Sequence, residues 1–180
     1  WSDGSIDVEK FTYNEEGKVL TRTIKDSDGT IVKWTYNKKG KMLTETTTRR
    51  DGTTDVTKFT YNEEGNMLTK TITWSDGTTD VTKYTYNKKG KLLTKTRTWS
   101  DGTITVTKFT YNEEGELLTE TTTWSDGTTD VTKYTYNDKG DMLTRTETQS
   151  DGSFIKERTY NKKGDLLSNT ITRTRSDGTI

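Results

Sequence analysis

Polar and apolar residues alternate along the chain in runs that end at glycine-containing loops. In the run 103–112, TITVTKFTYN, one set of alternate positions holds Ile, Val, Lys and Thr, and the other holds Thr, Phe and Tyr. Such alternation is typical of a β-strand with two different faces, and Thr, Val, Phe and Tyr all favour strands. Glycine returns every 11 to 14 residues, which is too often for stable helices. The pattern therefore predicts an all-β protein.

Two glycine signatures alternate with a period of about 25 residues and account for all fifteen glycines. Asn-x-x-Gly has its glycine at 17, 40, 65, 90, 115, 140 and 164, and Asp-Gly has its glycine at 4, 29, 52, 77, 102, 127, 152 and 178. Tight hairpin loops need such residues. We therefore expect tandem β-hairpin repeats that form a continuous antiparallel meander of about fourteen strands, a curled or spiralling, solenoid-like strip.

Residues 1–180 are interpreted as a single array of about seven hairpin repeats. The second repeat lacks two residues between Gly29 and Asn37, which shortens a strand but keeps its faces. The last repeat, 151–180, is degenerate, because Arg158 replaces an aromatic residue and its strand needs a bulge to restore the face pattern. The first and last residues, WSDG and SDGTI, share one phase of the repeat, which indicates a piece of a longer array.

The two loops are expected to differ in length. Asn-x-x-Gly suits a three-residue loop that pairs Asn87 with Lys91. If Asp-Gly also formed a three-residue loop, tyrosines 25 residues apart would point to opposite faces. A two-residue type I′ turn that pairs Ser100 with Thr103 keeps all tyrosines on one face, so we predict that turn.

This register predicts what each face carries. Face one has the tyrosines and a second aromatic row. Face two has leucines, a Val/Ile row and a charged row in which ten of twelve residues are basic. Candidate binding residues in that row are Lys58, Lys70, Lys83, Lys95 and Lys108. Its functional interpretation is a groove for a polyanion, and the alternative is a solvated stripe or a surface that pairs with a neighbouring copy.

Three tryptophans, Trp74, Trp99 and Trp124, recur beside the Asp-Gly turns and are placed on face two. Periodic tryptophans stack on sugar rings or pack on a cross-strand neighbour, so they are candidate polysaccharide-binding residues. The tips of the Asn-x-x-Gly loops alternate Glu-Glu with Lys-Lys or Asp-Lys. Opposite charges on neighbouring tips attract weakly and are expected to help fix the register.

Composition narrows the function further. Only 26% of residues are hydrophobic, 31% are charged and the net charge is zero, so nucleic acid is not expected as a partner. Histidine and cysteine are absent, which argues against an enzyme, and we expect no catalytic residues and no cofactor. Each Asp-Gly turn supplies one carboxylate, so no metal site is expected. No apolar run approaches the roughly 20 residues that span a membrane.

The unit TYNKKGKLLTKTRTWSDG resembles the RHS/YD-repeat (tyrosine-dipeptide) family. The matching dipeptides are Tyr13-Asn14, Tyr36-Asn37, Tyr61-Asn62, Tyr86-Asn87, Tyr111-Asn112, Tyr136-Asn137 and Tyr160-Asn161. The resemblance implies β-hairpins in long strips that spiral into shells or cell-surface structures, and a secreted bacterial context. The repeat here is longer, and the arginine before the tyrosine is absent. The hairpins are also similar to the single-layer sheet of spirochaete outer-surface lipoproteins, and a consensus-designed array is a third interpretation.

We therefore expect a structural repeat protein: a segment of an extracellular or cell-surface scaffold, shell or fibre that self-assembles by strand-edge pairing. The expected partner is the protein itself, in head-to-tail or stacked copies. The alternative is a module that binds cell-surface polysaccharide or a polyanion through the tryptophan and lysine rows.

Overall fold

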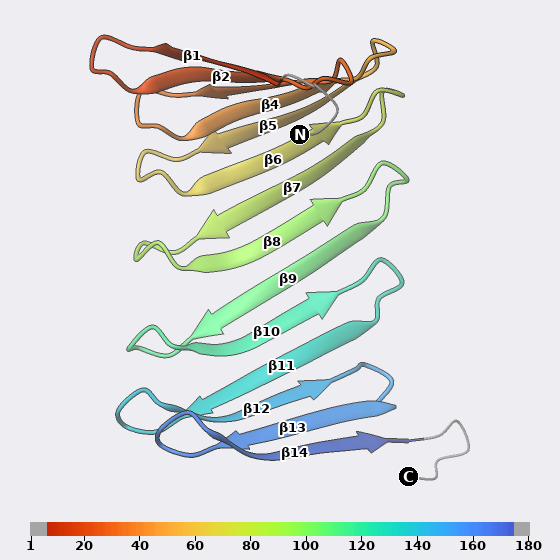
Figure 1. Ribbon diagram of the computed structural model, residues 1–180. Helices are drawn as coiled ribbons and strands as arrows, with labels where there is room; N and C mark the ends of the chain where they lie inside the picture. The colour runs from red at the N-terminus through yellow and green to blue at the C-terminus, as the bar shows by residue number, and fades with distance from the viewer. Residues whose placement is uncertain (1–6, 175–180) are drawn as a thin grey trace, which may run out of the picture. The chain divides into compact units, whose positions relative to one another are not determined.

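The computed structural model describes residues 7–174, so the Asp-Gly loops expected at Gly4 and Gly178 lie outside the described residues. The described part is all-β and contains no helix (Figure 1). Its strands are β1 (Val8–Tyr13), β2 (Val19–Lys25), β3 (Ile31–Tyr36), β4 (Met42–Thr48), β5 (Thr54–Tyr61), β6 (Met67–Thr73), β7 (Thr79–Tyr86), β8 (Leu92–Thr98), β9 (Ile104–Tyr111), β10 (Leu117–Thr123), β11 (Thr129–Tyr136), β12 (Met142–Thr148), β13 (Phe154–Tyr160) and β14 (Leu166–Arg173).

The strand order in the sheet follows the chain from β1 to β14, which confirms the predicted antiparallel meander of hairpins. The chain forms two compact units. The first contains the residues up to Lys83 together with Thr98–Gly102, and the second contains Tyr84–Arg97 and the residues from Thr103 onward. Within each unit, every strand pair for which a register is known joins strands that are consecutive in sequence.

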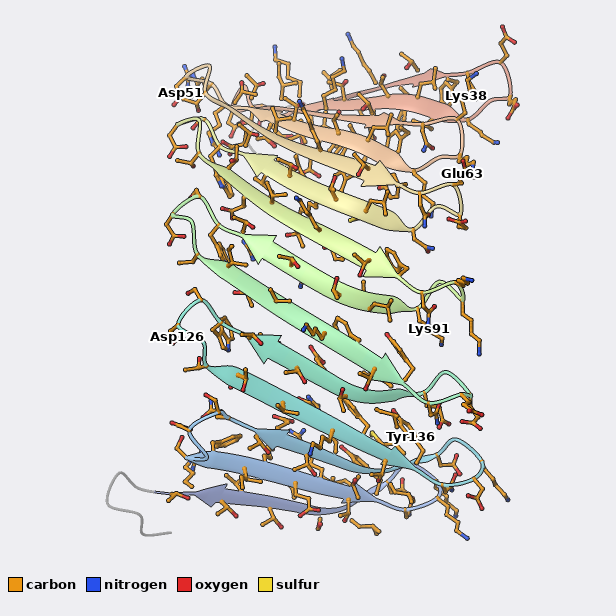
Figure 2. All side chains as sticks on the ribbon, turned by 180° about the vertical axis from the view of Figure 1, so that it is seen from behind. Lys38, Asp51, Glu63, Lys91, Asp126 and Tyr136 are labelled. Carbon is orange, nitrogen blue, oxygen red and sulfur yellow. The ribbon has the colours of Figure 1, made fainter. Side chains whose placement is uncertain are left out.

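The hairpins have no hydrophobic core. Among residues 7–174 no hydrophobic side chain is buried, and the buried residues are Asp80, Thr82 and Thr107. Figure 2 shows side chains projecting from both faces of the strands. Stability therefore comes from contacts between side chains on adjacent strands, each of which contributes roughly 0.2–1 kcal/mol. The low hydrophobic content of the sequence is consistent with this architecture.

Both loop signatures form the same three-residue loop, so the predicted two-residue Asp-Gly turn is wrong. In the Asn-x-x-Gly loop, the Asn62 amide donates to the Asn66 carbonyl, and the Gly65 amide donates to the Asn62 carbonyl. In the Asp-Gly loop, the Trp74 amide donates to the Thr78 carbonyl, and the Gly77 amide donates to the Trp74 carbonyl. Gly65 and Gly77 have φ of +87° and +85°, a conformation that side chains other than glycine rarely adopt.

A β-bulge after the Asn-x-x-Gly loop explains how the tyrosines still share one face in the hairpins of known register. Tyr61 pairs with Met67, but the preceding Thr60 pairs with Thr69, so Leu68 is an extra residue on β6. The same shift occurs at the corresponding point of the β1–β2, β3–β4, β9–β10, β11–β12 and β13–β14 hairpins. The Asp-Gly loop, one residue longer than predicted, shifts the alternation of side chains between the faces by one residue. The bulge shifts it by one more, so the two shifts cancel.

The two irregular repeats keep the face pattern in different ways. β3 has six residues where β5 has eight, and Tyr36 still pairs with Met42, as predicted. In the last repeat the compensation is an extra residue in the loop and not the expected bulge in the strand. The Gln149 amide donates to the Phe154 carbonyl, so this loop encloses four residues instead of three. Arg158 then pairs with Arg145, in the position of the missing aromatic residue.

Candidate functional site

The strand register defines two chemically different faces, because directly paired residues in an antiparallel sheet point the same way. We call one the aromatic face: Phe59 pairs with Lys70, Lys70 pairs with Thr82, and Tyr61 pairs with Met67. We call the other the threonine face, where Lys58 pairs with Thr71 and Thr71 pairs with Val81. In the second unit, Phe109 and Glu120 belong to the aromatic face, and Lys108 and Thr121 to the threonine face.

The predicted row of basic residues does not exist as one row, because the bulge sends alternate strands to opposite faces. Lys58, Lys83 and Lys108 lie on the threonine face, each opposite a threonine. Lys70 lies on the aromatic face opposite Phe59. Lys95 follows Thr94, whose hydroxyl meets that of Thr85 on the threonine face, so Lys95 also belongs to the aromatic face. Lys58 and Lys70, which the predicted register placed in one row, therefore lie on opposite faces.

The tryptophans also lie on a different face from the one predicted. Trp74 alternates with Lys70 and Ile72 and so belongs to the aromatic face. On that face the Trp124 indole N–H donates to an Asp130 carboxylate oxygen at 3.2 Å. Trp74, Trp99 and Trp124 are 42%, 36% and 45% exposed. They stay candidate sugar-binding residues, but the lysines of the threonine face do not share their surface.

Aromatic and charged side chains alternate across the strands of the aromatic face. In the first unit, the Arg22 guanidinium lies 4.9 Å from the centre of the Trp34 ring and 2.5 Å from Glu9. The Trp34 indole N–H donates to Glu45 at 2.9 Å. In the second unit, the Arg145 guanidinium lies over the Tyr134 ring at 5.9 Å. Charges on this face are thus engaged by neighbouring rings and carboxylates.

Adjacent hairpins are joined at their Asn-x-x-Gly ends by tyrosine hydroxyls. The Tyr61 hydroxyl donates to the Met42 carbonyl at 2.8 Å, which links one Asn-x-x-Gly end to that of the preceding hairpin. Ladder pairing of β4 with β5 begins only at Thr44, so this carbonyl lies in the part of β4 that the bulge leaves outside the ladder. The same bond joins Tyr111 to Leu92 and Tyr136 to Leu117, at 2.9 Å. Burial raises the pKa of these three tyrosines.

Charged loop tips also connect neighbouring hairpins, although not through carboxylates as expected. The Lys39 ammonium donates to the backbone carbonyl of Glu63 at 2.7 Å, and the Lys89 ammonium donates to that of Glu113 at 3.2 Å. Figure 2 shows the neighbouring tips that carry Lys38 and Glu63. The lysine tip therefore reaches the glutamate tip of the next hairpin through a backbone carbonyl, and the role of the opposite charges in fixing register stays a prediction.

At the Asp-Gly ends, aspartates hold both the loops and their neighbours. Within the loop, one Asp76 oxygen accepts from the amide and the hydroxyl of Thr78, at 2.8 and 2.6 Å. The Thr78 hydroxyl and amide together lower the pKa of Asp76. Between hairpins, Asp55 accepts from the Ser75 amide at 2.9 Å and forms an ion pair with Arg49. That ion pair with Arg49 is the main cause of the lowered pKa of Asp55.

Shallow grooves lie between successive loops. One, of about 490 Å³, is lined by Lys89, Lys91, Leu93, Phe109 and Tyr111 among others, and the Lys91 ammonium lies 5.8 Å from the Tyr111 ring centre. No three acidic, histidine or cysteine side chains gather as metal ligands in residues 7–174. The same range contains no helix long and apolar enough to cross a membrane.

Comparison with known proteins places the chain in a family without indicating an activity. A family model described as "Uncharacterised protein" matches residues 2–106, so the chain belongs to that family. No curated protein matches.

Solved structures give loose likenesses. The TcdB2-TccC3 structure is 13% identical with a TM-score of 0.49, over 93% of this chain and 12% of that one. A porin-like protein from Bacteroides uniformis is 14% identical with a TM-score of 0.44, over 95% of this chain and 90% of that one. The chain thus spans about an eighth of the first of these. The class of protein that the fold defines is a β-hairpin repeat protein.

Proposed function

We propose that this chain is a structural segment of an extracellular or cell-surface scaffold, a strip of RHS-like hairpins that grows by adding further hairpins at its ends. The observation that carries the proposal is the repeated contact between hairpins. The tyrosine-to-carbonyl bond joins Tyr61 to Met42 and recurs as Tyr111 to Leu92. A contact between unlike surfaces that repeats without closing is the kind that builds strips and filaments.

The end strands expose the two halves of this contact. Tyr13 on β1 is 57% exposed, whereas Tyr61, at the same position of an inner hairpin, is only partly exposed. Leu166 and Leu167 on β14 are 55% and 66% exposed. Leu166 pairs with Tyr160 and so holds the place of Met42 in the repeat. In the proposed assembly, β1 of one copy pairs with β14 of another, and the Tyr13 hydroxyl donates to the Leu166 carbonyl.

Exposed strand edges support this mechanism physically. An edge strand presents backbone N–H and C=O groups that another strand can pair with. Natural edge strands are often protected by charged side chains, and β14 carries the exposed Leu166, Leu167 and Ile171 beside one charged residue, Arg173. The proposed role is mechanical, and the partner is a further copy of the same repeat.

The test is to block each end separately. Phe11→Lys with Tyr13→Lys places two charges on β1, and Leu166→Lys with Ile171→Lys places two charges on β14. We expect wild-type mass to rise with concentration, as measured by light scattering on a sizing column with electron microscopy of the same peak. Either blocked variant alone is expected to stay at 20.6 kDa.

Mixing the two blocked variants sharpens the test, because each retains the end that the other lacks. The proposal predicts that the mixture forms a dimer and grows no further. A wild-type chain that stays monomeric at every concentration would overturn the proposal. So would a blocked variant that still forms long assemblies, since growth would then use another surface. Circular dichroism of each variant shows whether its sheet is intact.

A further inference from the structure

The threonine face carries an excess of positive charge, although the net charge of the whole chain is zero. Even-numbered strands present almost only threonine on it, as in Thr69, Thr71 and Thr73 of β6. On β2 this face also carries Lys25, which pairs with Val8. Odd-numbered strands from β1 to β11 add one lysine each. These lysines are Lys10, Lys33, Lys58 and Lys83 in the first unit and Lys108 and Lys133 in the second, and all six are exposed.

On the described strands of the first unit, no acidic side chain lies on the same face as these lysines. On strands β1 to β6 and on Thr79–Lys83, the acidic residues Glu9, Glu45, Asp55 and Asp80 all lie on the aromatic face. On the strands of the second unit, Glu157 lies on the threonine face, where it replaces the lysine of the last repeat. The ion pairs formed by Glu9 and Asp55 are likewise with arginines of the aromatic face.

The lysines are spaced as a regular series. Lys58 is opposite Thr71, which is opposite Val81, so Lys83 lies two residues further along its strand. Two strand spacings and a two-residue offset put the Lys58 and Lys83 positions about 12 Å apart. Lys10 and Lys33 lie in one lateral line through Thr23, because the short β3 removes the offset.

We propose that the threonine face binds a linear anionic polysaccharide laid across the strands. Charge complementarity selects an anionic polymer, since every charge on this face of the described strands of the first unit is positive. The threonine hydroxyls both donate and accept hydrogen bonds, as the hydroxyl and acidic groups of a glycan require. Among residues 7–174, the aromatic side chains, on which nucleic-acid bases would stack, lie on the opposite face of the strands. This favours a glycan over a nucleic acid.

The two faces offer a matched pair of variants for the test. Lys58→Gln with Lys83→Gln removes two charges from the threonine face, and Lys70→Gln with Lys95→Gln removes two from the aromatic face. Both double variants have the same composition and net charge, so bulk electrostatics are equal. Glutamine keeps part of the side-chain stem, and Lys58 and Lys83 are exposed, so the fold is preserved.

Binding is measured by titration calorimetry with dextran sulfate, with neutral dextran and single-stranded poly(dT) as comparison probes. We expect the wild type to bind dextran sulfate and not dextran, with affinity that falls as salt rises. The Lys58/Lys83 variant is expected to bind about tenfold more weakly, at the usual contribution of exposed charge pairs, and the Lys70/Lys95 variant within about twofold of wild type.

Three results would overturn the proposal. Equal losses in both double variants would show that only net charge matters. Absence of binding to dextran sulfate at low salt would remove the site. Tighter binding of poly(dT) than of dextran sulfate would assign the face to nucleic acid instead.

Discussion

The Asn-x-x-Gly loops and the Asp-Gly loops have the same backbone geometry, but different side-chain hydrogen bonds stabilise them. In Asn-x-x-Gly loops the first residue holds the loop: one Asn37 oxygen accepts from the amides of Lys39 and Lys41, both at 2.9 Å. In Asp-Gly loops the middle residue does so, as when Asp76 accepts from the amide and hydroxyl of Thr78. The glycine with positive φ is common to both.

The difference teaches that backbone shape and chemical sensitivity are set by separate residues. Glycine fixes the shape of both loops. The asparagine fastening does not titrate, whereas the aspartate fastening does. Between hairpins the contrast continues, since tyrosine hydroxyls connect the Asn-x-x-Gly ends and carboxylates such as Asp55 connect the Asp-Gly ends. One set of ends therefore responds to alkali and the other to acid.

The largest expected effect removes what the two loops share. Gly40→Ala and Gly77→Ala each place a side chain at positive φ, +77° and +85°, where the added Cβ meets no neighbour. The backbone strain should destabilise each hairpin by about 1–2 kcal/mol, equally in the two loops. Native-state hydrogen exchange of the flanking strands measures this. Gly→Asn at the same sites is the control, because asparagine tolerates this conformation better; a large loss in one loop alone would contradict a shared geometry.

A smaller effect is expected at the Asn-x-x-Gly ends alone. Tyr61→Phe removes the bond to the Met42 carbonyl and should destabilise β4–β5 contact by about 1 kcal/mol. Tyr13→Phe, on the exposed end tyrosine, should cost little and is the matched control.

The tyrosine contribution also has an alkaline limit. Because burial raises the pKa of Tyr61, its contribution is complete below the usual value of 10.0 and is lost as the pH rises through the raised pKa. A chemical denaturation series at increasing pH should converge for wild type and Tyr61→Phe. Curves that stay parallel at high pH would show that the hydroxyl is not the group involved.

The smallest effect should separate the two loops by acid. The Thr78 hydrogen bonds lower the pKa of Asp76, so its contribution is complete above the usual value of 3.8 and is lost as the pH falls through the lowered pKa. We expect the exchange protection of the Thr78 amide to fall in acid while that of the Asn66 amide stays constant. The control, Asp76→Asn, should abolish the pH dependence. Parallel loss at both amides would mean general unfolding instead.

The sequence was sufficient for the strands, their order and the loop positions, because alternation and glycine act locally. It was insufficient to assign side chains to the correct face of the sheet. That assignment depends on the total number of residues in all preceding strands, loops and bulges. Two departures, a longer Asp-Gly loop and a bulge at Leu68, change the sum twice and leave the tyrosines in place. A signal was present: Met67-Leu68 and Leu92-Leu93 put two apolar residues side by side, which breaks the alternation where the bulge lies.

The wrong loop length and the missed bulge also led to the wrong face assignment for the candidate binding residues. With the bulge ignored, Lys58 and Lys70 are assigned to one face, and with the bulge included they are on opposite faces. The tyrosine-to-carbonyl bond was beyond sequence reasoning for a related reason, since it needs a carbonyl that only the bulge leaves outside the ladder. Tertiary register, and not composition, determines both.

The cancelling of loop and bulge sets a rule for how such a chain can change length in evolution. A single-residue insertion or deletion in one strand would turn every later tyrosine to the wrong face, whereas changes of two residues, or paired odd changes, leave the later hairpins unaltered. The two irregular repeats obey this rule: β3 is two residues shorter than β5, and the last repeat combines a shorter strand with a loop one residue longer. Related chains should therefore differ in length by even numbers of residues within a hairpin, or by whole hairpins.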